Sequence, residues 1–166
     1  MEGETAVPKP AIDADDRKLL DALSRDARLS HRLLAQKTGL ALATVNRRVR
    51  RLEERGVIRG YRAIVDAEVV GWTMTAIVGL RLEKGHIRQV QKTIAKDPRV
   101  FGVYDVTGEW DGIILARVRD RADLDDLAKT TLSAPHINRT NTMVVLATVA
   151  EEAVVRVPEP TTRAPD

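Results

Sequence analysis

Residues 42–55, LATVNRRVRRLEER, constrain the chain more than any other segment. Apolar residues recur in it at intervals of three and four, as on one side of an α-helix: Leu42, Val45, Val49 and Leu52. At about 100° per residue, the other side receives a polar set: Thr44, Arg47, Arg48, Arg51 and Arg55. Arginine carries a planar fork of donors that fits phosphate groups and guanine edges. The segment therefore predicts a helix that contacts nucleic acid, rather than a charged helix that only faces solvent.

The residues before this segment predict the rest of a helix-turn-helix. Asp13 can cap a first helix, and Ser30 can cap a second, short one. Gly39 can end that second helix in the left-handed conformation. A short helix, a three-residue turn and an amphipathic basic helix make up the helix-turn-helix, in which the second helix of the pair enters the DNA major groove. We assign residues 12–56 to such a domain, of winged-helix-like type.

The hydrophobic pattern changes after a hinge. Residues 57–71 are rich in β-branched side chains and predict a linker strand. The later residues alternate or repeat at helical spacing in the order β-α-β-β-α-β, with strands expected over 73–83, 99–107, 110–119 and 137–149. This order is that of the ferredoxin-like fold. The sequence thus predicts an α+β protein with a ferredoxin-like domain over 72–150, between a flexible arm (1–11) and a disordered tail (151–166).

Composition narrows the class of protein. The chain has 166 residues, of which 43% are hydrophobic and 31% charged, as in ordinary folded proteins. It has no run of eighteen apolar residues and no cysteine, so we expect no membrane span, no disulfide and no thiolate metal site. Residues 1–62 hold 14 Lys and Arg against 9 Asp and Glu, whereas the remainder holds 13 against 15. The cations gather in the part of the chain that is expected to contact DNA. A cytoplasmic location is the default expectation.

Three segments together resemble the Lrp/AsnC (feast/famine) transcriptional regulators. These segments are IDADDRKLLDAL, GLALATVNRRVRRLEERGVIRGYRA and TGEWD, and the similarity runs from about Ile12 to Val149. The resemblance implies a homodimer built through the ferredoxin-like domains, often assembled into tetramers or octamers, with amino acids or related molecules bound between dimers. One departure is Ala41, where the family usually has a Ser that caps the recognition helix. Losing that cap costs roughly 1 kcal/mol.

The DNA contacts are predicted from the position of each residue on the helix-turn-helix. The N-terminal half of the recognition helix meets base edges, which points to Ala43, Thr44 and Arg47. We expect Arg48 and Arg51 to share base and phosphate contacts. Arg55 and His31 are expected to contact the DNA backbone.

An amino-acid effector needs an acceptor for its ammonium group and donors for its carboxylate. The turn of Thr107, Gly108, Glu109, Trp110 and Asp111 offers Asp111 as the acceptor and exposed backbone N–H groups as donors. Thr140 and Thr142 lie two residues apart, on one face of the last strand, and could supply hydroxyls. The alternative is a tight hairpin turn in which Asp111 caps backbone amides and the threonines only fill a β-surface.

Other functions fit the sequence less well. We expect no enzyme, no cofactor and no metal site, because His31, His86 and His136 fall in separate elements without a cysteine or a nucleophile motif. RNA binding on the sheet would need more aromatic residues than this domain contains. DNA compaction without sequence preference stays open, since the same arginines would serve it. Ile77, Phe101 and Val103 are out of register with the buried face and predict a pairing surface, unless they form a second apolar layer within the chain.

Overall fold

The computed structural model describes residues 11–151, so all but the last residue of the predicted arm and all but the first residue of the predicted tail lie outside the described residues. The described chain divides into two compact units, residues 11–64 and residues 65–151. None of its helices is both long and apolar enough to cross a membrane.

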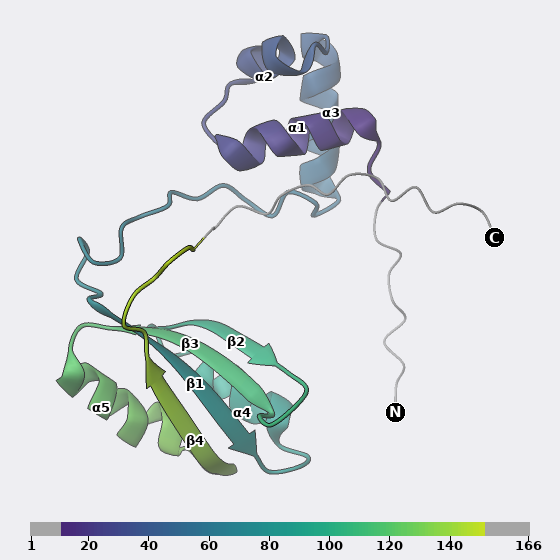
Figure 1. The fold of residues 1–166 in the computed structure, drawn as a ribbon. Coiled ribbons are helices and arrows are strands. Elements are labelled where there is room, and N and C mark those ends of the chain that lie inside the picture. The colour runs from purple at the N-terminus through teal and green to yellow at the C-terminus, as the bar shows by residue number, and fades with distance from the viewer. Residues whose placement is uncertain (1–10, 152–166) are drawn as a thin grey trace. The chain divides into compact units, whose positions relative to one another are not determined.

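The N-terminal unit contains three helices, α1 (Ala14–Arg25), α2 (His31–Thr38) and α3 (Leu42–Glu54) (Figure 1). The predicted caps are confirmed. Asp13 accepts a hydrogen bond from the Asp16 amide, and Ser30 accepts one from the Leu33 amide. Gly39 ends α2 with a φ of 74°. α3 begins at Ala41 without a side-chain cap, as its methyl group requires.

The three helices enclose a small hydrophobic core. The apolar side of α3 packs into it through Val45 and Val49, against Leu19, Leu23 and Leu34. Leu52 is also fully buried, so three of the four residues of the predicted stripe are confirmed. The prediction for Leu42 is wrong, because this residue lies in the first turn of α3 at the margin of the stripe and is 44% exposed.

The C-terminal unit is a four-stranded antiparallel sheet with helices on one side, formed by β1 (Met74–Leu82), α4 (Ile87–Ile94), β2 (Val100–Asp105), β3 (Gly112–Val118), α5 (Arg121–Lys129), the 3₁₀ turn η1 (Thr131–Ser133) and β4 (Ile137–Val144). The strands lie in the order β2-β3-β1-β4. The predicted ferredoxin-like α+β fold is confirmed. β4 is shorter than expected, since the Val145 amide makes the last bond to β1 and Leu146 is exposed.

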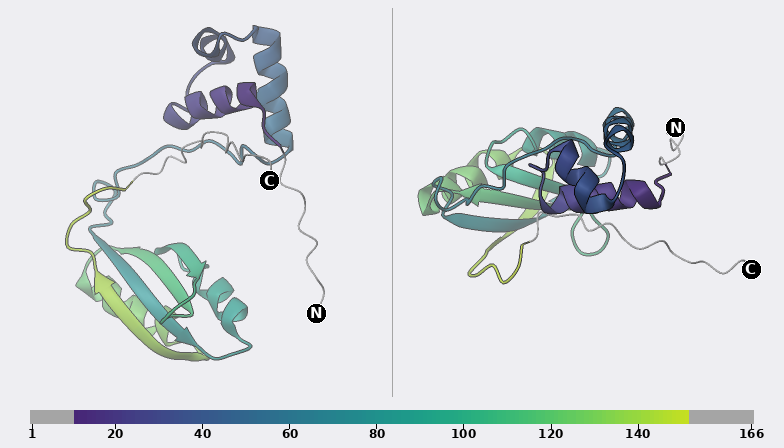
Figure 2. Two further views of the ribbon diagram at one scale, coloured as in Figure 1. Left: turned by 45° about the vertical axis from the view of Figure 1, so that its right-hand side comes forward. Right: turned by 90° about the horizontal axis from the view of Figure 1, so that it is seen from above.

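The two faces of the sheet differ in what covers them. Helices α4 and α5 lie on the same side in both views of Figure 2, over a core that includes Val78, Leu80 and Ile114. Among the described residues of this unit, no helix covers the opposite face, which we call the open face. Its apolar side chains follow from the register and the exposure: Ile77, Phe101, Tyr104, Ile113, Leu115 and Met143.

Val103 was predicted to lie on the pairing surface, and this prediction is wrong. The register of β2 shifts by one residue between Val100 and Gly102. A bulge of this kind exchanges the faces of the residues that follow it. Val103 therefore pairs with Ile114 and packs against the helix-covered core, whereas Tyr104 is 51% exposed.

Residues 57–71 form no β-strand, contrary to the predicted linker strand. Extended backbone becomes a strand only when a neighbouring strand accepts and donates its hydrogen bonds. Within residues 11–151 the segment has no such neighbour. Its apolar side chains stay outside, with Ile64 76% and Val65 60% exposed.

Candidate functional site

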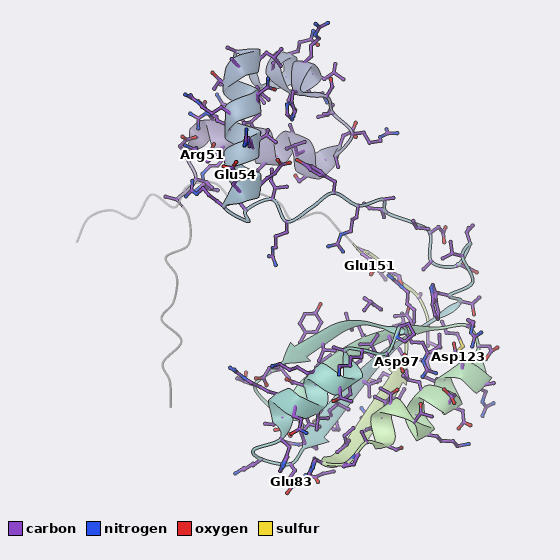
Figure 3. The ribbon with its side chains drawn as sticks, turned by 180° about the vertical axis from the view of Figure 1, so that it is seen from behind. Arg51, Glu54, Glu83, Asp97, Asp123 and Glu151 are labelled. Carbon is purple, nitrogen blue, oxygen red and sulfur yellow. The ribbon has the colours of Figure 1, made fainter. Side chains whose placement is uncertain are left out.

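The exposed face of α3 is the candidate nucleic-acid interface. Side chains at helical spacing border a shallow hollow of about 580 Å³ on it: Ala43, Asn46, Arg47, Arg50, Arg51 and Glu54. Arg51 and Glu54 both lie on α3 in Figure 3. The hollow thus joins two of the predicted base contacts, Ala43 and Arg47, with residues that the sequence prediction did not name.

The arginines of this face differ in what already binds them. Arg50 pairs with Glu54 one turn later at 2.8 Å. Arg51 reaches the buried carboxylate of Asp16 in α1, also at 2.8 Å. Within the described part of the chain, Arg47 makes no ion pair or hydrogen bond through its side chain. Its guanidinium group is therefore available to a ligand without breaking an internal contact.

Arg48 does not lie where the sequence prediction placed it. Its guanidinium group bonds three carboxylates at the start of α1, at 2.6 Å to Asp13, 3.1 Å to Asp15 and 2.9 Å to Asp16. Only 17% of the side chain is exposed. The hydrogen bonds that Arg48 donates to Asp13 and Asp16 raise the pKa of Arg48, and the bond to Asp13 lowers the pKa of that carboxyl group. Arg48 therefore connects α3 to the start of α1 through ion pairs instead of pointing toward solvent.

The helical geometry explains both the error and the omission. The buried stripe is centred on Val45, Val49 and Leu52. At about 100° per residue, Arg48 lies only about 60–70° from that centre, so it borders the core. Asn46 and Arg50 were missed, although measuring angles from this centre places Arg50 well toward the exposed side.

The other predicted DNA contacts occupy three different positions. Thr44 is partly buried in the first turn of α3. His31, at the start of α2, places its Nδ1 atom 2.6 Å from the side-chain oxygen of Asn46. Arg55, at the end of α3, donates to the carbonyl oxygen of Ala11 at 3.2 Å. The His31 contact links the two helices of the motif and orients Asn46 on the exposed face.

The turn from Thr107 to Asp111 joins β2 to β3. The Asp111 carboxylate accepts a hydrogen bond from the Leu82 amide at 2.8 Å, and the Asp111 amide donates to the Leu80 carbonyl at 2.9 Å. The guanidinium group of Arg81 lies 3.6 Å from the second carboxylate oxygen. Asp111 thus caps backbone groups at the end of β1, as in the hairpin alternative. Its second carboxylate oxygen stays available for other contacts.

The predicted effector residues do not form one group within the chain. Trp110 lies against Gly79 on the open face, where a Cβ atom would come within 2.6 Å of its ring, and Arg139 lies over that ring at 5.3 Å. Thr140 and Thr142 pair with Leu80 and Val78, so both threonines belong to the helix-covered side, at the exposed edge of the sheet. Directly paired residues share a face. Thr107, Gly108 and Glu109 are exposed.

A second hollow, of about 890 Å³, lies beside the ends of α4 and α5. Arg99 bonds Asp97 at 2.7 Å, Asp123 at 3.1 Å and Asp126 at 2.7 Å across it. Figure 3 shows Asp97 and Asp123 close together, at the end of the unit opposite to Glu83. Because the cation and the acids satisfy one another, this cluster joins β2 to α5 and is not a vacant binding site.

Comparison with known proteins gives both units a counterpart. Residues 12–59 match the family model for a winged helix-turn-helix DNA-binding domain, and residues 75–155 match the model for the Lrp/AsnC ligand binding domain. An HTH-type transcriptional regulator of Pyrococcus horikoshii is 41% identical over 141 residues, which cover 85% of this chain and 95% of that protein. The leucine-responsive regulatory protein of Haemophilus influenzae is 34% identical, with 85% and 87% covered.

A solved structure agrees with the fold over both units. The feast or famine regulatory protein of M. tuberculosis, in complex with L-methionine, has a TM-score of 0.81 to this structure and 31% sequence identity. The match covers 89% of this chain and all of that one. The helix-turn-helix and the ferredoxin-like domain therefore occur together, in this order, in a known regulator.

Proposed function

Because the chain belongs to the Lrp/AsnC family of transcriptional regulators, we propose that it recognises specific double-stranded DNA sequences through α3. An amino acid or a related small molecule then modulates its DNA binding or its assembly. The observation that carries the DNA half of the proposal is the exposed face of α3, where Arg47 has no partner among the described residues. A helix presented in this way fits the width of the major groove.

The structure changes which residues we propose for the DNA contact. Ala43, Thr44 and Arg47 remain the base contacts, and the exposed Arg50 joins them. Arg51 remains a contact shared between bases and phosphates, and His31 and Arg55 remain contacts to the DNA backbone. Arg48 is withdrawn, because moving it to DNA would leave the buried Asp16 with one cation fewer.

Binding to genomic fragments and to random DNA at one fixed salt concentration tests this assignment. Arg47→Ala should weaken the specific complex by about 1–3 kcal/mol and relax the sequence preference, because it removes a base contact. Arg55→Ala should weaken all sequences alike. If Arg47→Ala weakens random and specific DNA by the same factor, Arg47 contacts the backbone only. A native protein without sequence preference would instead favour DNA compaction.

For the effector, we propose that the turn from Thr107 to Asp111 contributes to an amino-acid site. The M. tuberculosis relative is described in complex with L-methionine, and the second carboxylate oxygen of Asp111 faces only Arg81, at 3.6 Å. Since Thr140 and Thr142 lie on the other side of the sheet from Trp110, a second chain would have to complete the site. This requirement agrees with effector binding between dimers.

Calorimetry with the standard amino acids tests the effector site. Asp111→Asn keeps an oxygen for the Leu82 amide but removes the charge that would attract an ammonium group, so affinity should fall. Asp105→Asn, an exposed aspartate at the end of β2, is the matched control and should bind as the native protein does. A ligand that binds both variants equally would place the site elsewhere.

A further inference from the structure

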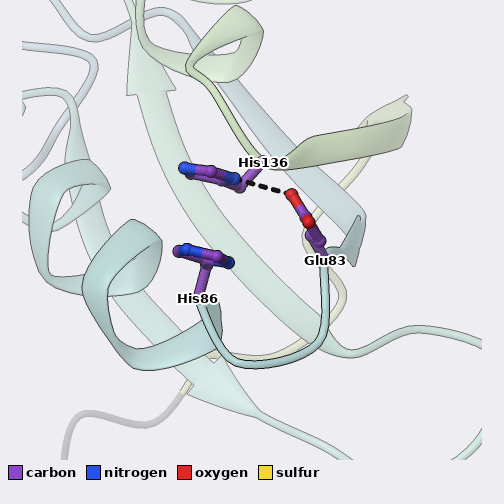
Figure 4. Close-up of side chains that lie close together, drawn as sticks. All are labelled: Glu83, His86 and His136. Atoms are coloured by element: carbon purple, nitrogen blue, oxygen red, sulfur yellow. Dashed lines mark hydrogen bonds and ion pairs between the residues drawn. The ribbon is translucent and has the colours of Figure 1, made fainter.

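Two histidines that are distant in sequence come together at the end of the sheet. His86 lies between β1 and α4, and His136 lies just before β4 (Figure 4). Their rings are parallel within 2°, with centroids 3.7 Å apart. Glu83 places a carboxylate oxygen 2.6 Å from Nδ1 of His136. The histidines do fall in separate elements, as predicted, but the fold brings the two loops that carry this pair together.

The backbone holds these loops together. The Glu83 amide donates to the His136 carbonyl at 2.9 Å, and the His86 amide donates to the Glu83 carbonyl at 3.2 Å. His136 has a φ of 70°, the one positive φ of a non-glycine residue among residues 11–151. This conformation is costly for a residue with a Cβ atom. A backbone conformation of this kind at His136 favours a functional role for its side chain.

The polar atoms of the cluster are not all satisfied internally. Nδ1 of His86 is buried and has no hydrogen-bond partner among the described residues. An unpaired buried nitrogen costs free energy, so this atom would gain a favourable interaction from a ligand. One ligand atom from each of Glu83, His86 and His136 lies within 4.8 Å of the others.

We propose that Glu83, His86 and His136 bind a divalent transition-metal ion of the Zn²⁺ or Co²⁺ type. Two imidazole nitrogens and one carboxylate oxygen are a donor set that such ions prefer, whereas Ca²⁺ and Mg²⁺ prefer oxygen alone. The chain has no cysteine, so no thiolate competes for the ion. Three protein ligands leave a fourth position open to water or to a small molecule.

Loading the site requires the side chains to move. Zn–N bonds of about 2.0–2.1 Å place tetrahedral ligand atoms roughly 3.3 Å apart. The ligand atoms of the three residues already lie within 4.8 Å of one another, so they must come somewhat closer. The lone pairs of parallel rings do not converge, so the rings must tilt toward each other. The side chains of Glu83 and His136 are 54% and 36% exposed, which leaves them room to move.

The proposed ion would also lie next to the turn that carries Asp111. Two consecutive amides at the end of β1 donate hydrogen bonds to different partners. The Leu82 amide donates to the Asp111 carboxylate, and the Glu83 amide donates to the His136 carbonyl oxygen. An ion that draws His136 and Glu83 together would stiffen this end of β1. The metal site itself does not depend on the proposed effector or on DNA binding.

The test uses the full chain without a polyhistidine tag, stripped of metal by a chelator. Titration with Co²⁺ should produce the intense visible bands of a tetrahedral complex at one ion per chain, and calorimetry with Zn²⁺ should give the same stoichiometry. His86→Ala and His136→Ala should each weaken binding by at least about tenfold, since even partners that only orient a ligand contribute that much. His31→Ala is the matched control and should bind as the native protein does.

A measurement on the native protein removes the risk that a variant misfolds. During a Zn²⁺ titration, the imidazole NMR signals of two of the three histidines should shift to saturation, and those of His31 should stay. The proposal fails if the Co²⁺ spectrum remains that of the free aqueous ion. It also fails if His31 shifts with the others, or if the alanine variants bind Zn²⁺ as tightly as the native chain.

Discussion

Arg47 and Arg48 show how neighbouring, chemically identical residues can serve different tasks. Arg48 is enclosed by the carboxylates of α1, whereas Arg47 lines the exposed hollow of α3. We expect Arg48→Met to lower the melting temperature of the helical unit, because Asp16 is buried and loses one of its cations. Arg47→Met should leave that temperature unchanged and weaken DNA binding.

Thermal unfolding followed by helical circular dichroism, together with DNA binding measured well below the transition, separates the two tasks. The pair serves as its own matched control, since both variants lose one positive charge from the same helix. Equal losses of DNA affinity with unchanged melting temperatures would show that Arg48 faces DNA after all.

The cluster of Asp97, Arg99 and Asp123 predicts a pH dependence of stability. The hydrogen bonds from Arg99 and from Arg119 hold the pKa values of Asp97 and Asp123, respectively, below their usual range. Groups with a lowered pKa contribute stability above their unfolded value of about 4. That contribution is lost as the pH falls through the lowered values. The C-terminal unit should therefore be most stable near neutral pH and weaken on acidification.

Arg99→Met tests this cluster directly. Removing the cation leaves the two buried acids without it, so we expect a cost of about 3 kcal/mol at neutral pH. The cost should shrink on acidification, because protonated acids no longer need a counter-charge. Arg88→Met, at an exposed position of α4, is the control. Denaturant unfolding at several pH values measures both, and a cost that does not vary with pH would contradict the assignment.

At the scale of the elements, α3 lacks a side-chain cap at its N-terminus, and adding one should stabilise it. Ala41 occupies the N-cap with φ −62° and ψ 142°, the extended conformation that a capping residue adopts. Ala41→Ser should add a hydrogen bond to the first turn and stabilise the helical unit by about 1 kcal/mol. Amide hydrogen exchange in α3 measures this gain. Ala27→Ser, at an exposed position after α1, should show none.

The elements that were predicted from sequence are those fixed by local interactions. The Asp13 and Ser30 caps and the left-handed Gly39 act within a few residues of the helix ends they define, so a sequence pattern contains them. The face of Val103 was missed because a bulge depends on pairing with β3. The fold, rather than any local pattern, brings His86 and His136 together. The predicted residues of the DNA contact and of the effector turn remain hypotheses for the experiments above.

The whole molecule needs a second copy if its DNA recognition is to be effective. One helix-turn-helix reads only a few base pairs, and such proteins commonly bind two half-sites about one helical turn apart. The open face of the sheet offers the surface for pairing, since helices cover the opposite face and Phe101 and Met143 are each 44% exposed. We therefore expect a homodimer formed through the open face, with larger assemblies built from it.

Phe101→Glu tests this arrangement, because a charge on each of two facing sheets opposes their burial against one another. The single chain should keep its fold, since Phe101 is exposed in it and contacts the guanidinium group of Arg117. Light scattering at micromolar concentration should then report a monomer, and DNA affinity should fall together with dimerisation. Gln89→Glu, at an exposed position of α4, adds the same charge to the helical side and should remain dimeric. A native monomer, or a Phe101→Glu protein that still dimerises, would show that the open face is not the surface through which two recognition helices are joined.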